Sequence, residues 1–169
     1  VRSRGLGDVY KRQPYYLGNF WYAHRRYEEA TVCWEKSVEI NNQFPTALRN
    51  LSLAYYNKKG RKEEACRLLE KAFELDQTDS RIFMELDQLY KKMGRAHAER
   101  LTFLEAHLEL VAQRDDLCIE RITLYNQLGN YEKARELKPD QKDLWLNGLY
   151  RVYYNLQMGP EFEEIEKLM

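Results

Sequence analysis

The chain has 169 residues, of which 27 are lysine or arginine and 27 are aspartate or glutamate, so its formal net charge is zero. This balance does not favour broad attraction to nucleic acid or to an anionic membrane. No stretch approaches the roughly 18 consecutive apolar residues of a membrane span.

The three cysteines, Cys33, Cys66 and Cys118, are far apart and odd in number. They form no C-x-x-C pair, so the sequence predicts free thiols in a reducing compartment and no disulfide framework or zinc site. No signal-peptide pattern is present in the sequence. We therefore expect a cytoplasmic location.

Residues 1–13 carry Arg2, Arg4, Lys11 and Arg12 but no apolar periodicity. The letters G-L-G-D-V-Y-K-R-Q resemble a translated sequencing-adapter tail. We expect a tail outside the repeats that is disordered or an artefact. The alternative is a basic arm that binds an acidic partner.

From residue 14 the sequence repeats. Leu17 and Leu51 are 34 residues apart, Leu51 and Leu86 are 35 apart, and Ala30 and Ala65 are also 35 apart. A fixed period of this size, with two amphipathic helical patterns around a turn, is typical of stacked helix-turn-helix repeats. The sequence therefore predicts an all-α solenoid.

We expect repeats at residues 14–44, 45–79, 80–114 and 115–139, the last of them shortened, and an incomplete repeat at 140–169. The second repeat has one residue more in its turn than the first. In the third repeat, the position that needs a small residue between the two helices falls at Glu99 or Arg100. The last helix lacks a polar outer face that would cap a solenoid, which predicts a fragment of a longer array.

The spacing of large and small residues resembles the tetratricopeptide repeat family over residues 14–160. The first copy matches with Leu17, Gly18, Trp21, Ala30, Trp34 and Ser37, and the second with Leu48, Leu51, Tyr55, Gly60, Ala65, Leu69 and Ala72. The resemblance implies a right-handed α-solenoid of about four to five repeats, with a concave groove lined by the inner helices. It implies no catalytic residue.

Phrases such as R-Y-E-E-A and F-P-T-A-L-R-N-L-S-L-A-Y-Y-N-K are more narrowly similar to the repeat region of large bacterial proteins. Those proteins carry an amino-terminal domain of unknown function related to carbohydrate-handling β-sandwiches.

The groove is expected to expose the residues of the inner helices that packing does not need. These are Tyr15, Tyr16, Asn19, Tyr22, Arg49, Asn50, Tyr56, Arg81, Glu85 and Gln88. Aromatic rings beside amides and arginines can stack on a peptide or a sugar and bond its polar edge. The alternative is that these tyrosines are half-buried between neighbouring helices.

The family's clamp for a terminal carboxylate is matched by Asn19, Asn50 and Arg81. Tyr15 and Glu85 replace its other two residues. A carboxylate at Glu85 is expected to repel a bound carboxylate, which argues against that clamp.

The sequence predicts a non-catalytic scaffold that binds a protein or peptide segment, or an adjacent domain of its own parent chain. His24, His97 and His107 lie at no recognisable metal spacing, and we expect no catalytic residue, cofactor, metal or nucleic acid. The alternatives are an accessory module of a bacterial carbohydrate-active protein and a self-association array. Self-association would use exposed aromatics such as Trp145, Tyr150 and Tyr154.

Overall fold

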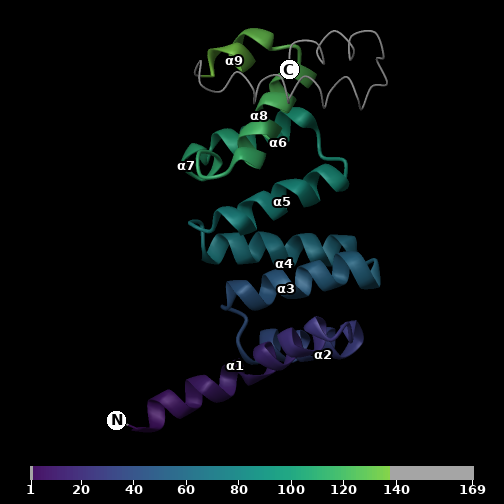
Figure 1. The fold of residues 1–169 in the computed structure, drawn as a ribbon, viewed down its shortest axis with the longest axis vertical. Coiled ribbons are helices and arrows are strands. Elements are labelled where there is room, and N and C mark those ends of the chain that lie inside the picture. Colours follow the sequence, from purple (N-terminus) through teal and green to yellow (C-terminus); the bar gives the residue numbers. More distant parts are fainter. Residues whose placement is uncertain (1, 138–169) are drawn as a thin grey trace. The chain divides into compact units, whose positions relative to one another are not determined.

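The structure, a computed structural model, describes residues 2–137, with side chains from residue 12 onward. The predicted incomplete repeat and its aromatics Trp145, Tyr150 and Tyr154 lie outside these residues. Every regular element in the described part is helical (Figure 1). No helix between residues 2 and 137 is both long enough and apolar enough to cross a membrane.

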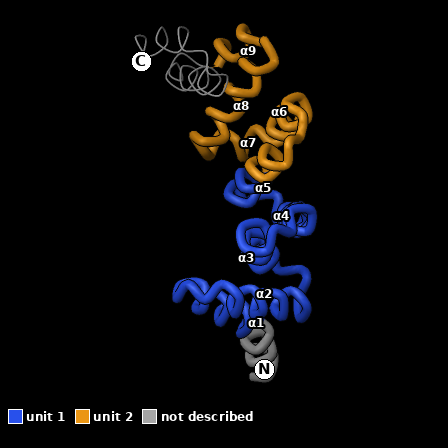
Figure 2. The backbone as a smooth tube through the Cα atoms, turned by 90° about the vertical axis from the view of Figure 1, so that its right-hand side faces the viewer, with its two compact units in different colours: residues 1–86 blue, residues 87–169 orange. Residues whose placement is uncertain are grey.

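The helices are α1 (Arg2–Ala23), α2 (Tyr27–Ile40), α3 (Pro45–Ala54), the π-helical turn η1 (Tyr55–Lys59), α4 (Lys62–Leu75), α5 (Ser80–Lys92), α6 (His97–Glu105), α7 (Leu108–Val111), α8 (Asp115–Gln127) and α9 (Tyr131–Glu136). The chain divides into two compact units, residues 1–86 and 87–169, with the boundary inside α5 (Figure 2).

The first helix begins earlier than the sequence suggests. Its backbone is helical from Arg2, so residues 2–13 form the first half of α1. Pro14 lies inside this helix, where its ring removes one backbone hydrogen bond. The three arginines of this segment, with Leu6, Lys11 and Gln13, favour helix, and that preference needs no apolar periodicity.

In the first unit, small residues allow the paired helices to approach closely. A Cβ atom added to Gly18 of α1 would lie 2.5 Å from the indole ring of Trp34 of α2. In the next pair, the Ser52 hydroxyl donates to the carbonyl oxygen of Ala65 at 2.7 Å. Ala30 and Ala65 are completely buried, as expected for the helix crossings.

The extra residue of the second repeat forms the π-helical turn. The left-handed residue that ends the first helix lies 8 positions after Leu17 at Arg25, but 9 positions after Leu51 at Gly60. The added residue thus falls before Gly60, where the backbone hydrogen bonds of η1 span one residue more than those of an α-helix. The distance from the left-handed residue to Ala65 is unchanged, so the helix crossing at Ser52 is preserved.

The third repeat places a buried ion cluster where the sequence led us to expect a small residue. Arg100 occupies the small-residue position, and its guanidinium donates to both carboxylate oxygens of Asp87, at 3.0 and 2.6 Å. Asp87 is 35 residues after Ser52, so both members of the small pair have been replaced by charged residues. Arg100 also donates to Glu120 at 2.8 Å. All three side chains are at most 1% exposed.

Lys91 completes this cluster by donating to Glu120 at 2.8 Å from the solvent side. Burial raises the pKa of Asp87 despite the contact with Arg100. Burial alone would also raise the pKa of Glu120, but the bonds from Lys91 and Arg100 lower it below the usual value. The position where the sequence predicted a problem in helix packing is therefore filled by a cluster that includes two acids and two bases.

Candidate functional site

A pocket of about 470 Å³ lies in the first unit along the helices α1, α3 and α5. We call it the inner groove. Its lining residues are Tyr15, Asn19, Tyr22, Ala23, Trp34, Thr46, Arg49, Asn50, Leu53 and Arg81. The first helices of three successive pairs thus contribute to one site.

A directed chain of hydrogen bonds fixes the amides of the inner groove. The indole N–H of Trp34 donates to Asn19 Oδ1 at 3.1 Å, and Asn50 Nδ2 donates to the same oxygen at 3.0 Å. An indole nitrogen can only donate, so the atom of Asn19 that faces it must be the oxygen. The Nδ2 group of Asn19 is therefore the part of this amide that remains to donate to a ligand.

The guanidinium of Arg49 extends the chain toward α5. It donates to Asn50 Oδ1 at 3.2 Å and to Glu85 Oε2 at 2.6 Å, with a second contact to the other Glu85 oxygen. The Arg49 and Glu85 side chains are only 12% and 15% exposed, as expected for a held bidentate pair.

The more exposed guanidinium of the groove belongs to Arg81, whose side chain is 65% exposed. Its Nε atom lies 3.3 Å from Glu85, so Glu85 lies between two arginines. The repulsion of anions that we expected from Glu85 is therefore offset. These three residues together carry one net positive charge.

Aromatic packing positions the two tyrosines of the groove. The Tyr15 ring meets Phe44 edge to face with centroids 4.9 Å apart. The Tyr22 ring lies 5.4 Å from Trp34 and 5.2 Å from Tyr27, yet Tyr22 remains 47% exposed. Each ring is thus braced on one side and open on another.

Several predicted groove residues lie elsewhere. Tyr16 is 59% exposed and contacts Tyr15, but does not line the pocket. Tyr56 lies half-buried in η1, Glu85 binds Arg49 but does not line the pocket, and Gln88 belongs to the second unit.

Trp34, Ala23 and Thr46 line the groove although sequence reasoning did not place them there. Trp34 had been assigned to packing between the helices of one pair. Its ring does contact Gly18, but its N–H also orients Asn19. No spacing rule connects a residue on α1 with the indole nitrogen of α2, so the sequence holds no simple signal for this second role. Among residues 2–137 no three histidine, cysteine or acidic side chains gather as a metal site would require.

Comparison with known proteins places this architecture in a class. Residues 46–75, which span the second helix pair, match the family model described as tetratricopeptide repeat. The chain is similar to the crystal structure of MamA, with a TM-score of 0.65 and 16% identity over 87% of this chain and 81% of that one. The α-solenoid of tetratricopeptide-type helix pairs predicted from the sequence is thus confirmed.

Two further solved structures share the fold. One is YrrB, described as a TPR protein with an unusual peptide-binding site, with a TM-score of 0.62 and 19% identity over 88% of this chain and 78% of that one. The other is pilF of Pseudomonas aeruginosa, with a TM-score of 0.63 and 19% identity over 88% of this chain and 70% of that one.

Proposed function

We propose that the chain is a non-catalytic scaffold whose inner groove binds an extended peptide segment of a partner. The observation that carries the proposal is that Asn19, in the lining of the groove, accepts two hydrogen bonds at Oδ1 and so keeps its N–H₂ group as a donor. Asn50 and Arg81 lie in the same groove and add donors. A peptide in extended conformation presents unpaired carbonyl oxygens, which can accept hydrogen bonds from the side chains of Asn19, Asn50 and Arg81.

The tyrosines of the groove suit the same ligand. Tyr15 and Tyr22 offer braced ring faces with a hydroxyl at the tip, which can cover the side chains between successive peptide carbonyls. The net positive charge of Arg49, Arg81 and Glu85 favours a segment with acidic residues. YrrB, which shares this fold, is described as having an unusual peptide-binding site, and this supports a peptide as the ligand proposed here.

The segment can belong to a separate protein or to another domain of the parent chain. Both sources present the same chemistry, and a test with isolated peptides followed by a search of the parent gene distinguishes them. A carbohydrate-handling domain encoded in the same gene would favour an accessory role in such a protein.

The proposal is tested by selecting peptides from a random display library on the full chain and titrating the selected peptides by fluorescence anisotropy. Replacing Asn50 and Arg81 by alanine removes one amide and one charged donor, so we expect binding at least tenfold weaker. Lys36→Ala, on the exposed side of α2, is the matched control and should leave the affinity unchanged. Equal binding by the groove variant, with unchanged helicity, would contradict the proposal.

A further inference from the structure

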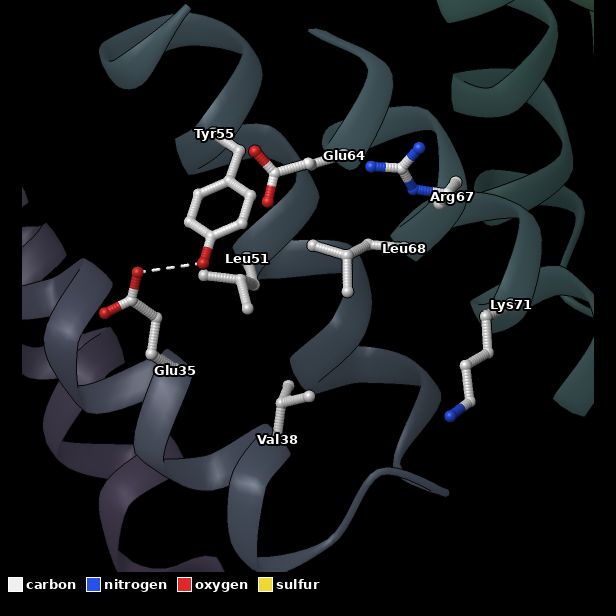
Figure 3. A pocket seen from close by; sticks show the side chains of 8 residues that line it. All are labelled: Glu35, Val38, Leu51, Tyr55, Glu64, Arg67, Leu68 and Lys71. Atoms are coloured by element: carbon white, nitrogen blue, oxygen red, sulfur yellow. Dashed lines mark hydrogen bonds between the residues drawn. The ribbon is translucent and has the colours of Figure 1, made fainter. Parts of the chain in front are cut away.

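A second pocket of about 390 Å³ lies in the first unit between α2, α3, η1 and α4 (Figure 3). We call it the outer pocket. Its lining residues are Glu35, Val38, Leu51, Tyr55, Glu64, Arg67, Leu68 and Lys71. It shares no residue with the inner groove, so a ligand here is distinct from the peptide proposed above.

The floor of the outer pocket is apolar and held in place. Val38, Leu51 and Leu68 converge on the middle of the pocket beside the Tyr55 ring (Figure 3). The Tyr55 hydroxyl donates to Glu35 at 2.8 Å, and burial of this ring raises the pKa of its hydroxyl. The guanidinium of Arg61 lies 3.8 Å from the centre of the same ring. The Tyr55 side chain is thus held at its hydroxyl and on one face of its ring.

The two acids of the pocket already have basic partners. Arg61 forms a close ion pair with Glu64 and lies 3.7 Å from a carboxylate oxygen of Glu35. Glu35 also accepts the Tyr55 hydroxyl. The carboxylates therefore face the pocket with their charge largely offset.

The two bases of the pocket are arranged differently. Arg67 and Lys71 are four residues apart on α4, so their side chains leave the same face of the helix on consecutive turns. Neither forms an ion pair with any residue in the described part of the chain. Figure 3 shows both beside Leu68, on the side of the pocket away from Glu35.

We propose that the outer pocket binds an acidic segment of a partner protein, in which a large aliphatic side chain is flanked by carboxylates. The aliphatic side chain would lie over buried Leu51 and remove the exposed atoms of the half-buried Val38 and Leu68 from water. The carboxylates would accept charge-assisted hydrogen bonds from Arg67 and Lys71. A lysine-flanked segment would instead place like charges against these two bases.

The test uses blocked octapeptides with two central leucines, titrated into the full isotope-labelled chain and followed by the NMR signals of Leu68. One peptide carries glutamates on both sides of the leucines, a second carries lysines, and a third keeps the glutamates but has serines in place of the leucines. We expect the glutamate peptide with leucines to shift the Leu68 signals and to bind at least tenfold more tightly than the other two.

A charge exchange makes the test specific to this pocket. The variant with Arg67→Glu and Lys71→Glu should bind the glutamate peptide at least tenfold more weakly and the lysine peptide more tightly. Both positions are at the surface of α4, and circular dichroism checks that the variant keeps its helicity. No shift of Leu68 with any peptide, or equal binding by the exchanged variant, would overturn the inference.

The inner groove provides the control for location. The variant with Asn50→Ala and Arg81→Ala should bind the glutamate peptide as the parent does. Loss of binding in that variant would assign the peptide to the inner groove and overturn the outer pocket, while leaving the groove function intact. Failure of the groove function itself would show only with the peptides selected for the groove.

Discussion

At the scale of single residues, the contact of Gly18 with Trp34 links the stability of the first helix pair to the inner groove. The Trp34 ring occupies the space that any β-carbon at position 18 would need, and its N–H orients Asn19. Gly18 is also buried. One glycine thus determines both how closely α1 meets α2 and how the groove amide is oriented.

Replacement of Gly18 by alanine should therefore destabilise the protein. In an unconstrained helix the same change stabilises by about 1 kcal/mol, but here the overlap with the rigid indole should cost about 1–3 kcal/mol. Urea unfolding followed by circular dichroism measures the difference. A variant as stable as the parent, or more stable, would show that Trp34 moves aside without cost.

The buried cluster around Arg100 shows how a large charged side chain replaces a small one. Arg100 is accommodated because Asp87, at the facing position, is also charged, and both are buried with Glu120. Taking such charges out of water is costly, and their mutual bonds offset that cost only while the set is complete.

Loss of Arg100 alone should be severe. Arg100→Ala leaves the Asp87 carboxylate buried without its partner, which should lower the free energy of unfolding by about 3–5 kcal/mol. The double variant Asp87→Ser with Arg100→Ala reproduces the Ser52 and Ala65 pair of the second repeat, and should recover more than 1 kcal/mol of this loss. Urea unfolding of both variants tests the expectation, which fails if the double variant is no more stable than the single one.

At the scale of elements, the turns that follow α1, η1 and α5 repeat one arrangement. An arginine directly after the left-handed residue donates its backbone N–H to the carbonyl of an aromatic residue at the end of the preceding helix, and lays its guanidinium over that ring. The stacked pairs are Arg26 on Trp21, Arg61 on Tyr55 and Arg95 on Tyr90, at 4.5, 3.8 and 3.6 Å. Such stacking contributes only modestly to stability at exposed sites. Together with the backbone hydrogen bond, it helps to set the direction in which the chain leaves each of these turns.

The π-helical turn should make the second repeat tolerant of a deletion. Removing exposed Lys58 restores the turn length of the first repeat, so we expect a change in unfolding free energy within about 1 kcal/mol, the scale of small surface effects. Removing Glu70 instead rotates Ala72 and Phe73 by about 100° around α4, and turns buried residues toward water. Circular dichroism and urea unfolding should separate the two deletions, and similar losses in both would contradict the role assigned to η1.

At the scale of the whole molecule, the fold class could be predicted because a fixed repeat period in the sequence is typical of stacked helix pairs. The period of Leu17, Leu51 and Leu86 requires stacked helix pairs, and the small residues Ala30 and Ala65 mark their crossings. The helical start of α1 was missed, because helix propensity without an apolar face leaves no periodic signal.

The inner groove could be predicted only in part. Asn19, Asn50 and Arg81 follow from the face that packing leaves unused. Their bonds depend on side-chain geometry between helices far apart in sequence, such as the pairing of Arg49 with Glu85, and no local pattern encodes that pairing. The outer pocket was missed for the same reason, because four separate elements build it.

The stacked architecture also predicts that damage stays local. The most extensive contacts join α1 with α2, α2 with α3 and α3 with α4 in the first unit, and α6 with α8 and α8 with α9 in the second. In such quasi-one-dimensional folds, stability is close to a sum of repeat and nearest-neighbour terms. A weakened helix pair should therefore unfold locally while the distant helix pairs of the chain stay folded.

Native-state hydrogen exchange tests this expectation. Gly18→Ala should speed exchange of the amides of α1 and α2 several-fold, and leave those of α8 unchanged. Arg100→Ala should speed exchange of the amides of α8 and leave those of α1 and α2 unchanged. The reason is that Asp87, Arg100 and Glu120 bind α5, α6 and α8 together. Uniform acceleration along the chain in either variant would mean that the helix pairs unfold as one cooperative body, and that the two sites of the first unit cannot be perturbed independently of the rest.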